Sequence, residues 1–238
     1  MRNLGFARVT ERTVREKLTI EWTPYSKLPP LPDTRDEILA IASALKADKD
    51  RDIFLGAAAT KATALNGVLS DSRIVAFATH GLLPGDFPGL SQPALALAVS
   101  EGKDADKEPI SAILTLEDVL SLKLNAEWVV LSACNTAAGD GAGAEAISGL
   151  GRGFFYAGSR ALLVTQWPVE TVSARKIVTS LFEKYSANPS LPRAEALKLA
   201  MLDVMQDGER EGTNNKLLYS YAHPMFWAPY VLIGDGGR

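Results

Sequence analysis

Three short runs of apolar residues, at residues 74–78, 128–131 and 161–164, contain no polar position. Strands that alternate apolar and polar residues have one solvated face, whereas continuous apolar runs of this length are typical of strands buried on both faces of a parallel sheet. The first run leads to His80 and the second to Cys134. The pattern therefore predicts buried strands that end in side chains capable of nucleophilic chemistry.

Helical spacing of apolar residues separates these runs from one another. It predicts helices over residues 36–45, 58–69, 115–122, 144–157, 172–185 and 193–206. We expect Thr115 to cap one helix and Gly158 to end another in a left-handed conformation. Shorter apolar segments predict strands over residues 52–55 and 94–99, and a last strand over residues 225–234 that a proline interrupts. Alternating strands and helices indicate an α/β fold with a mostly parallel, doubly wound central sheet.

The first 28 residues differ from the rest of the chain. Residues 17–22 alternate like an exposed or edge strand, and the proline-rich stretch at residues 28–33 continues neither helix nor sheet. We therefore expect an N-terminal arm or linker at residues 1–28 and one α/β domain at residues 29–238.

Composition excludes several classes of function. With 238 residues, 47% hydrophobic and 22% charged, the chain has enough apolar material for an ordinary globular core. A net charge of −3 without a basic cluster disfavours nucleic-acid binding. The single cysteine forms no internal disulfide, and one cysteine with two histidines makes no zinc set without carboxylates. No stretch has the pattern of a signal peptide or a membrane span, so we expect a soluble, cytoplasmic protein.

His80 and Cys134 are the candidate catalytic pair. Parallel strands end at one edge of their sheet, so the two side chains are expected to face each other there. A nearby imidazole favours the thiolate, which is the nucleophile, and backbone N–H groups of Gly81 and Cys134 are placed to bind an oxyanion. A lone cysteine or histidine is more often structural. The 54-residue separation, however, is close to the caspase spacing, in which the histidine lies about 50 residues upstream.

Several motifs together resemble those of the CHAT family of caspase-like cysteine peptidases. They stand at residues 31–38 (LPDTRDEI), 77–81 (FATHG), 130–136 (VLSACNT), 166–169 (QWPV), 223–228 (HPMFWA) and 232–235 (LIGD). The resemblance implies a caspase-hemoglobinase-like three-layer fold with a His80/Cys134 dyad, a protein substrate and no cofactor. Family members are commonly joined to tetratricopeptide repeats, and some cleave a partner protein in bacterial defence. A sensor or repeat module in the same or another polypeptide is therefore an expected partner.

The resemblance says less about the substrate pocket. Clan relatives that cut after Arg or Lys carry an acidic residue two positions before the cysteine, where this chain has Ser132. Gln166 and Trp167 resemble a strand end that lines the substrate cleft in caspase-like folds, although Trp167 is equally suited to core packing. Asp140 is a further candidate for the pocket, while a solvated loop is its more common fate.

Three alternatives stay open at this point. His223 is a second candidate base or metal ligand, but a histidine before a proline favours a structural turn. The glycine-rich stretch at residues 141–146 satisfies a permissive dinucleotide fingerprint, yet it lies too far from its strand and lacks the acidic partner. The caspase-like body is also compatible with a catalytically silent scaffold that binds protein partners, or with a thiol enzyme acting on a non-peptide acyl group.

Overall fold

The computed structural model describes residues 25, 28–29, 31–99, 109–132, 142–167, 169–211 and 217–237. Cys134 and Asp140, two of the residues singled out above, lie outside these ranges, as does the alternating segment at residues 17–22. The strands of the described part are β1 (Ile74–Phe77), β2 (Gly81–Leu82), β3 (Ala94–Ala96), β4 (Ile113–Thr115), β5 (Trp128–Leu131), β6 (Ala161–Thr165), β7 (Glu209–Glu211), β8 (Leu217–Ser220) and β9 (Tyr230–Gly234).

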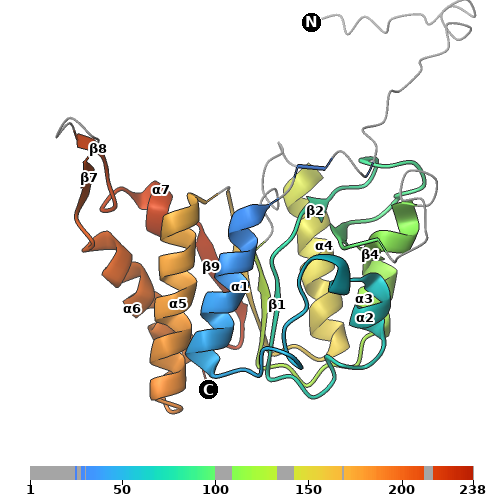
Figure 1. The fold of residues 1–238 in the computed structure, drawn as a ribbon, viewed down its shortest axis with the longest axis horizontal. Helices are drawn as coiled ribbons and strands as arrows, with labels where there is room; N and C mark the ends of the chain where they lie inside the picture. The colour runs from blue at the N-terminus through green and yellow to red at the C-terminus, as the bar shows by residue number, and fades with distance from the viewer. Residues whose placement is uncertain are drawn as a thin grey trace, which may run out of the picture.

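Seven α-helices connect these strands within the described ranges (Figure 1). They are α1 (Pro32–Leu45), α2 (Lys61–Leu65), α3 (Leu116–Ser121), α4 (Ala142–Ala157), α5 (Thr171–Ala187), α6 (Arg193–Met205) and α7 (Pro224–Trp227), and short 3-10 helices occupy Gly56–Ala58 and Pro109–Ala112. Thr115 caps α3 through a capping box with Asp118, and Gly158, with a φ of 112°, follows the last residue of α4. Both expected helix ends are confirmed.

The central sheet has the strand order β1-β5-β6-β9. The β1–β5 and β5–β6 pairs are parallel, whereas β9 runs antiparallel to β6. The expected mixed α/β fold with a mostly parallel central sheet is therefore confirmed. A smaller antiparallel sheet, β2-β3-β4, follows β1 directly and has its own apolar cluster with Phe87 and Leu90.

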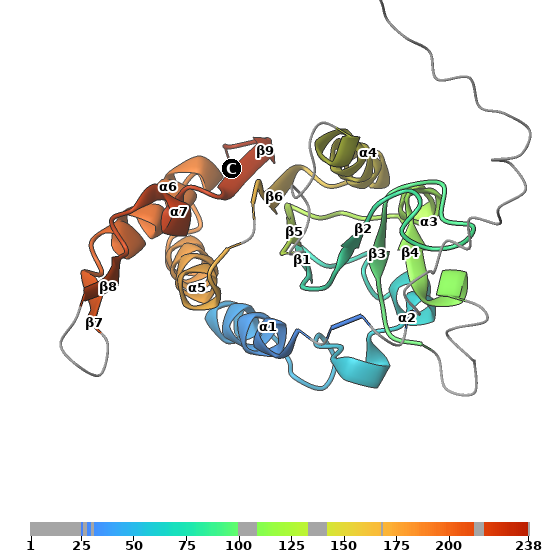
Figure 2. The same cartoon turned by 90° about the horizontal axis from the view of Figure 1, so that it is seen from above.

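Helices cover both faces of the central sheet, which gives three layers consistent with a caspase-like fold (Figure 2). On one face, Trp128, Val130 and Leu163 pack with residues of α1, α5 and α6. On the other, strand residues such as Val129 and Leu131 pack with residues of α3 and α4. Adjacent residues of β5 thus face opposite layers and all are buried, as the continuous apolar pattern predicts.

One predicted strand is wrong and another is only partly right. Residues 53–55 have no regular structure and pair with no strand among the described residues. The run at residues 225–234 is divided: Pro224 occupies the first turn of helix α7, and β9 begins only after Pro229. A proline fixes the backbone for a helical start and cannot donate to a sheet, so the two prolines separate a helical turn from the strand. The helix expected over residues 58–69 is also shorter, spanning Lys61–Leu65.

Candidate active site

The register of β1 and β5 determines how the two candidate catalytic residues follow their strands. Ile74 pairs with Trp128 and Phe77 with Leu131, so paired residues are 54 positions apart. The pairing extends one residue further, because the Ser132 N–H donates to the Phe77 carbonyl at 3.0 Å. His80 and Cys134 are also 54 positions apart, each three residues beyond the last paired residue of its strand.

The His80 ring is oriented by the segment that precedes α1. Its Nε2 lies 2.8 Å from the carbonyl oxygen of Pro29. A carbonyl oxygen only accepts hydrogen bonds, so Nε2 carries the proton in this contact and Nδ1 is left as the basic nitrogen of the neutral ring. The side chain is partly exposed, as a group that exchanges a proton with a substrate has to be.

The backbone around His80 is anchored on the small sheet. The His80 carbonyl accepts a hydrogen bond from the Ala96 N–H at 2.9 Å, and the Thr79 hydroxyl donates to the Ala96 carbonyl. Gly81 follows as the first residue of β2 and pairs with Leu95 of β3. These contacts fix the direction in which the chain leaves β1, and they place Gly81 directly beside the candidate base.

Gln166 and Trp167 lie just beyond the end of β6, the strand next to β5. The Gln166 N–H donates to the Pro229 carbonyl at 2.9 Å, and its side chain is exposed. The Trp167 indole N–H donates to the Met225 carbonyl at 3.4 Å. Both residues therefore share the carboxyl edge of the sheet with the residues that follow β1 and β5, and Trp167 additionally links this edge to α7.

His223 has a structural position. It precedes Pro224 at the start of α7, and its Nδ1 accepts a hydrogen bond from the Met225 N–H at 3.2 Å. An imidazole nitrogen used as a helix cap is not available as a base without breaking the cap. The structural interpretation of His223 is therefore confirmed.

Glu37 is a feature of this edge to which the sequence analysis assigned no chemistry. Its side chain is 6% exposed, and its Oε2 accepts a hydrogen bond from the Ser132 hydroxyl at 2.9 Å. Burial raises the pKa of Glu37 to about 7, while the hydrogen bond from Ser132 acts in the opposite direction. The sequence did contain a signal, because Glu37 is four residues before the buried Ile41 and shares its helix face.

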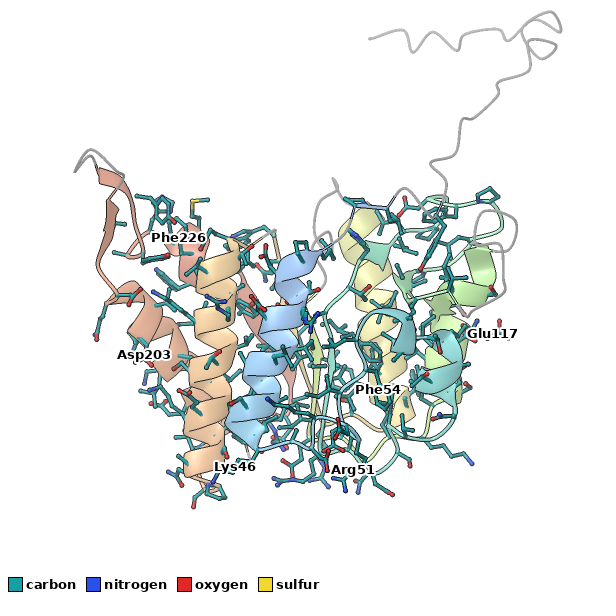
Figure 3. The ribbon with its side chains drawn as sticks, viewed as in Figure 1. Lys46, Arg51, Phe54, Glu117, Asp203 and Phe226 are labelled. Atoms are coloured by element: carbon teal, nitrogen blue, oxygen red, sulfur yellow. The ribbon has the colours of Figure 1, made fainter. Side chains whose placement is uncertain are left out.

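An open hollow of about 1100 Å³ extends along β1 between α1 and the segment that leads to α2. Its lining includes Pro29, Ile38, Phe54 and His80. Figure 3 shows Phe54 between α1 and α2, and Arg51 at the end of the sheet near Lys46, which follows α1. The His80 side chain thus borders this hollow, whose lining includes neither Gln166 nor Trp167.

Metal-binding clusters and membrane-spanning helices are both absent from the described residues. No group of three or more His, Cys, Asp or Glu side chains there is arranged to hold a metal ion. None of the described helices is both long enough and apolar enough to cross a bilayer.

Sequence comparison decides the family. Residues 11–235 match the CHAT domain, which is nearly the whole chain. The chain belongs to the CHAT domain family. The CHAT match begins inside the expected N-terminal arm, and Tyr25, also from that arm, packs against Phe87 and donates its hydroxyl to the Leu97 carbonyl at 2.6 Å.

A curated relative comes from mouse. Tetratricopeptide repeat protein 28 of Mus musculus is 28% identical over 234 residues, which cover 87% of this chain and 9% of the mouse protein. The CHAT chain therefore spans less than a tenth of the length of this relative, whose name refers to a repeat module.

Proposed function

We propose that this CHAT domain is a caspase-like cysteine endopeptidase with Cys134 as the nucleophile and His80 as the base. The observation that carries the proposal is the β1–β5 register, because it pairs residues at the same 54-residue separation as the two catalytic candidates. Family membership supports it, since CHAT domains are related to caspase-like cysteine peptidases. The Pro29 contact supports it further by leaving His80 Nδ1 free to accept a proton.

The reaction begins with proton transfer from the Cys134 thiol to His80 Nδ1. The thiolate attacks the carbonyl carbon of the scissile peptide bond, and the developing oxyanion is bound by the backbone N–H groups of Gly81 and Cys134. His80 then donates the proton to the leaving amine, and a thioester remains on Cys134. Water attacks the thioester with His80 again acting as the base, which releases the carboxyl product and the free thiol. The residues require no cofactor for these steps.

The Pro29 carbonyl has a defined part in this cycle. Once His80 is protonated, the ring carries a positive charge, and a carbonyl oxygen at 2.8 Å from Nε2 stabilises that charge while it holds the ring plane. Gln166 and Trp167 line the substrate cleft from the neighbouring strand end, and Asp140 contributes to the pocket.

The substrate is a protein partner, and a sensor or repeat module regulates its cleavage. The support is the tetratricopeptide name of the mouse relative, of which this chain matches only a short part. Cleavage of a partner in defence signalling, in bacteria as in some family members, is the cellular role we propose. A reducing compartment such as the cytoplasm suits a chain whose one cysteine works as a free thiol.

The experiment compares wild-type protein with Cys134→Ala, each incubated with the proteins encoded beside its gene. We expect fragments of one partner with the wild type and none with the variant, and sequencing the new termini identifies the cleaved bond. Partner binding without fragments in either sample would contradict a peptidase and identify the chain as a caspase-like scaffold.

A further inference from the structure

One short segment contacts the ends of both strands that lead to the proposed catalytic pair. The Pro29 carbonyl accepts the His80 Nε2–H hydrogen bond at 2.8 Å, and Glu37 Oε2 accepts the Ser132 hydroxyl at 2.9 Å. Pro29 and Glu37 are eight residues apart, on either side of the start of α1 at Pro32. The start of α1 therefore supports the end of β1 and the end of β5 at once.

Ser132 is held from two directions. Its N–H donates to the Phe77 carbonyl at 3.0 Å, which extends the β1–β5 ladder beyond Leu131. Its hydroxyl donates to Glu37 of α1. Ser132 is two residues before Cys134, so it is the last described point on the path from the sheet to the nucleophile.

Packing alone does not account for a carboxyl group at this place. Glu37 is 6% exposed, and its second oxygen, Oε1, has no hydrogen-bond partner in the part of the chain that the structure describes. A buried carboxyl without a cation destabilises the folded protein, and an apolar side chain of similar size would avoid that cost. The one polar contact that the Glu37 side chain makes among the described residues is the contact with Ser132.

We propose that Glu37 is a positioning residue for Cys134, and that it acts by holding Ser132 while Pro29 holds His80. Both supports come from one short stretch of the chain, since Pro29 lies three residues before the first residue of α1 and Glu37 lies in the second turn of that helix. The proposal rests on the proposed peptidase function. It does not make Glu37 a catalytic residue, since the carboxyl is bonded to Ser132 and not to the reacting groups.

The charged groups near Glu37 do not replace Ser132 as its partner. On α1, Asp33 accepts from the Thr171 hydroxyl at 3.1 Å and Asp36 pairs with Arg175 at 3.6 Å. At the N-cap of α5, Glu170 accepts from the Ser173 N–H at 2.8 Å. From the end of β1, His80 is bonded to Pro29. Each of these groups thus has its own partner, and none of them forms an ion pair with Glu37 within the described ranges.

Cys134 is the only cysteine of the chain, so its reactivity can be measured without a known substrate. The experiment records the rate of alkylation by iodoacetamide from pH 5 to pH 9, which follows the thiolate fraction. The variants are Glu37→Ala, Glu37→Gln and Ser132→Ala, with His80→Ala as reference. Asp36→Ala is the matched control because Asp36 lies next to Glu37 on α1 and is exposed.

We expect Glu37→Ala and Ser132→Ala each to lower the alkylation rate at pH 7 by about tenfold, because a misplaced imidazole stabilises the thiolate less. Combining the two changes should add little, since both remove the same contact. Glu37→Gln should retain most of the rate, because an amide oxygen also accepts from the Ser132 hydroxyl. Asp36→Ala should match the wild type.

The two proposals fail in different ways. If His80→Ala lowers the rate and the folded Glu37→Ala and Ser132→Ala proteins do not, the positioning role is wrong and the peptidase proposal stands. If His80→Ala also leaves the rate unchanged, both are wrong. Circular dichroism shows which variants fold, and Ser132→Ala decides the question alone if Glu37→Ala does not fold.

Discussion

At the residue scale, single contacts separate the roles of similar side chains. His80 and His223 are the only histidines, and each lies within one of the motifs that resemble the family, FATHG and HPMFWA. His80 uses Nε2 to donate to a carbonyl, whereas His223 uses Nδ1 to accept from a backbone N–H. The first contact leaves a basic nitrogen free, and the second occupies it. This difference is the basis on which we propose His80, and not His223, as the base.

Replacing His223 should therefore affect stability and leave catalysis largely intact. His223→Ala removes the cap of α7, and loss of a helix cap costs about 1 kcal/mol. We expect a lower midpoint of urea unfolding and a cleavage rate close to that of the wild type. Loss of cleavage in folded His223→Ala, as complete as in His80→Ala, would instead identify His223 as the base.

Glu37 should make the stability of the domain depend on pH. Burial raises its pKa from the ordinary value of 4.5 to about 7, so between these values the folded protein binds a proton that the unfolded chain has released. Stability from this group is present below pH 4.5 and is lost as pH rises through 7, by about 3 kcal/mol. Urea unfolding should show this loss in the wild type and not in Glu37→Gln. Equal pH dependence of the two proteins would show that the carboxyl is not protonated when buried.

At the element scale, the join between α4 and β6 depends on one glycine. Gly158 has a φ of 112°, and a Cβ placed on it would lie 2.1 Å from the Leu124 carbonyl oxygen. Only glycine, which has no Cβ, adopts this backbone conformation at so short a distance from another segment of the chain. Gly158 therefore allows α4 to end here and the chain to turn towards β6.

Gly158→Ala should lower the free energy of unfolding by more than about 2 kcal/mol, because backbone strain adds to the clash with Leu124. Gly67→Ala is the matched control: Gly67 has a φ of 94°, but nothing lies within 4 Å of the position that a Cβ would take there. It should lose only about 1 kcal/mol. Equal losses of unfolding free energy in the two variants would show that the Leu124 segment moves to accommodate the added Cβ at little cost.

The elements differ in how well the sequence predicts them. The strands β5 and β6 were predictable because a strand buried on both faces is apolar at nearly every position. The same apolar pattern located β1, but β1 is an edge strand in which Ile74 and Ala76 are only partly buried. Residues 53–55 carry the same composition without a pairing partner in the described part, and composition does not reveal a missing partner. Only the start of the last strand was misplaced, because apolar side chains bury equally well in a helical turn, and Pro224 and Pro229 decide between the two.

The candidate site was also only partly predictable from the sequence. His80 follows a strand whose pattern is unambiguous, so its place at the carboxyl edge could be inferred from the sequence. The contacts of Glu37 with Ser132 and of Pro29 with His80 could not, because they join residues 95 and 51 positions apart. Such contacts depend on how α1 is laid against the sheet, which no local pattern encodes.

At the scale of the whole molecule, the residues that follow β9 connect elements that are distant in the sequence. Arg193, at the start of α6, is fully buried and pairs with the half-exposed Asp235 at 3.2 Å. The Arg193 backbone N–H also donates to the Gly237 carbonyl at 2.9 Å, and the Asp235 N–H donates to the Arg160 carbonyl at 3.0 Å. The residues after β9 thus connect α6 with the turn between α4 and β6.

Asp235→Ala should be strongly destabilising, because it removes the carboxylate that contacts a buried guanidinium, at a cost of about 3 kcal/mol. Arg193→Met, which removes the charge and keeps most of the volume, should cost much less or even stabilise the protein. Urea unfolding of the two variants measures the difference. A smaller loss for Asp235→Ala than for Arg193→Met would show that the guanidinium is solvated from outside the fold.

The most direct test of the central claim is the pH dependence of Cys134 alkylation in wild-type protein and in His80→Ala. If the imidazole and the sulfur form a pair, the wild-type thiolate titrates well below the ordinary cysteine pKa of about 8.5, and His80→Ala moves the profile up towards that value. The rate at pH 7 then falls about tenfold or more. Superimposable profiles in the two folded proteins would show that the two residues do not meet, and would contradict the peptidase.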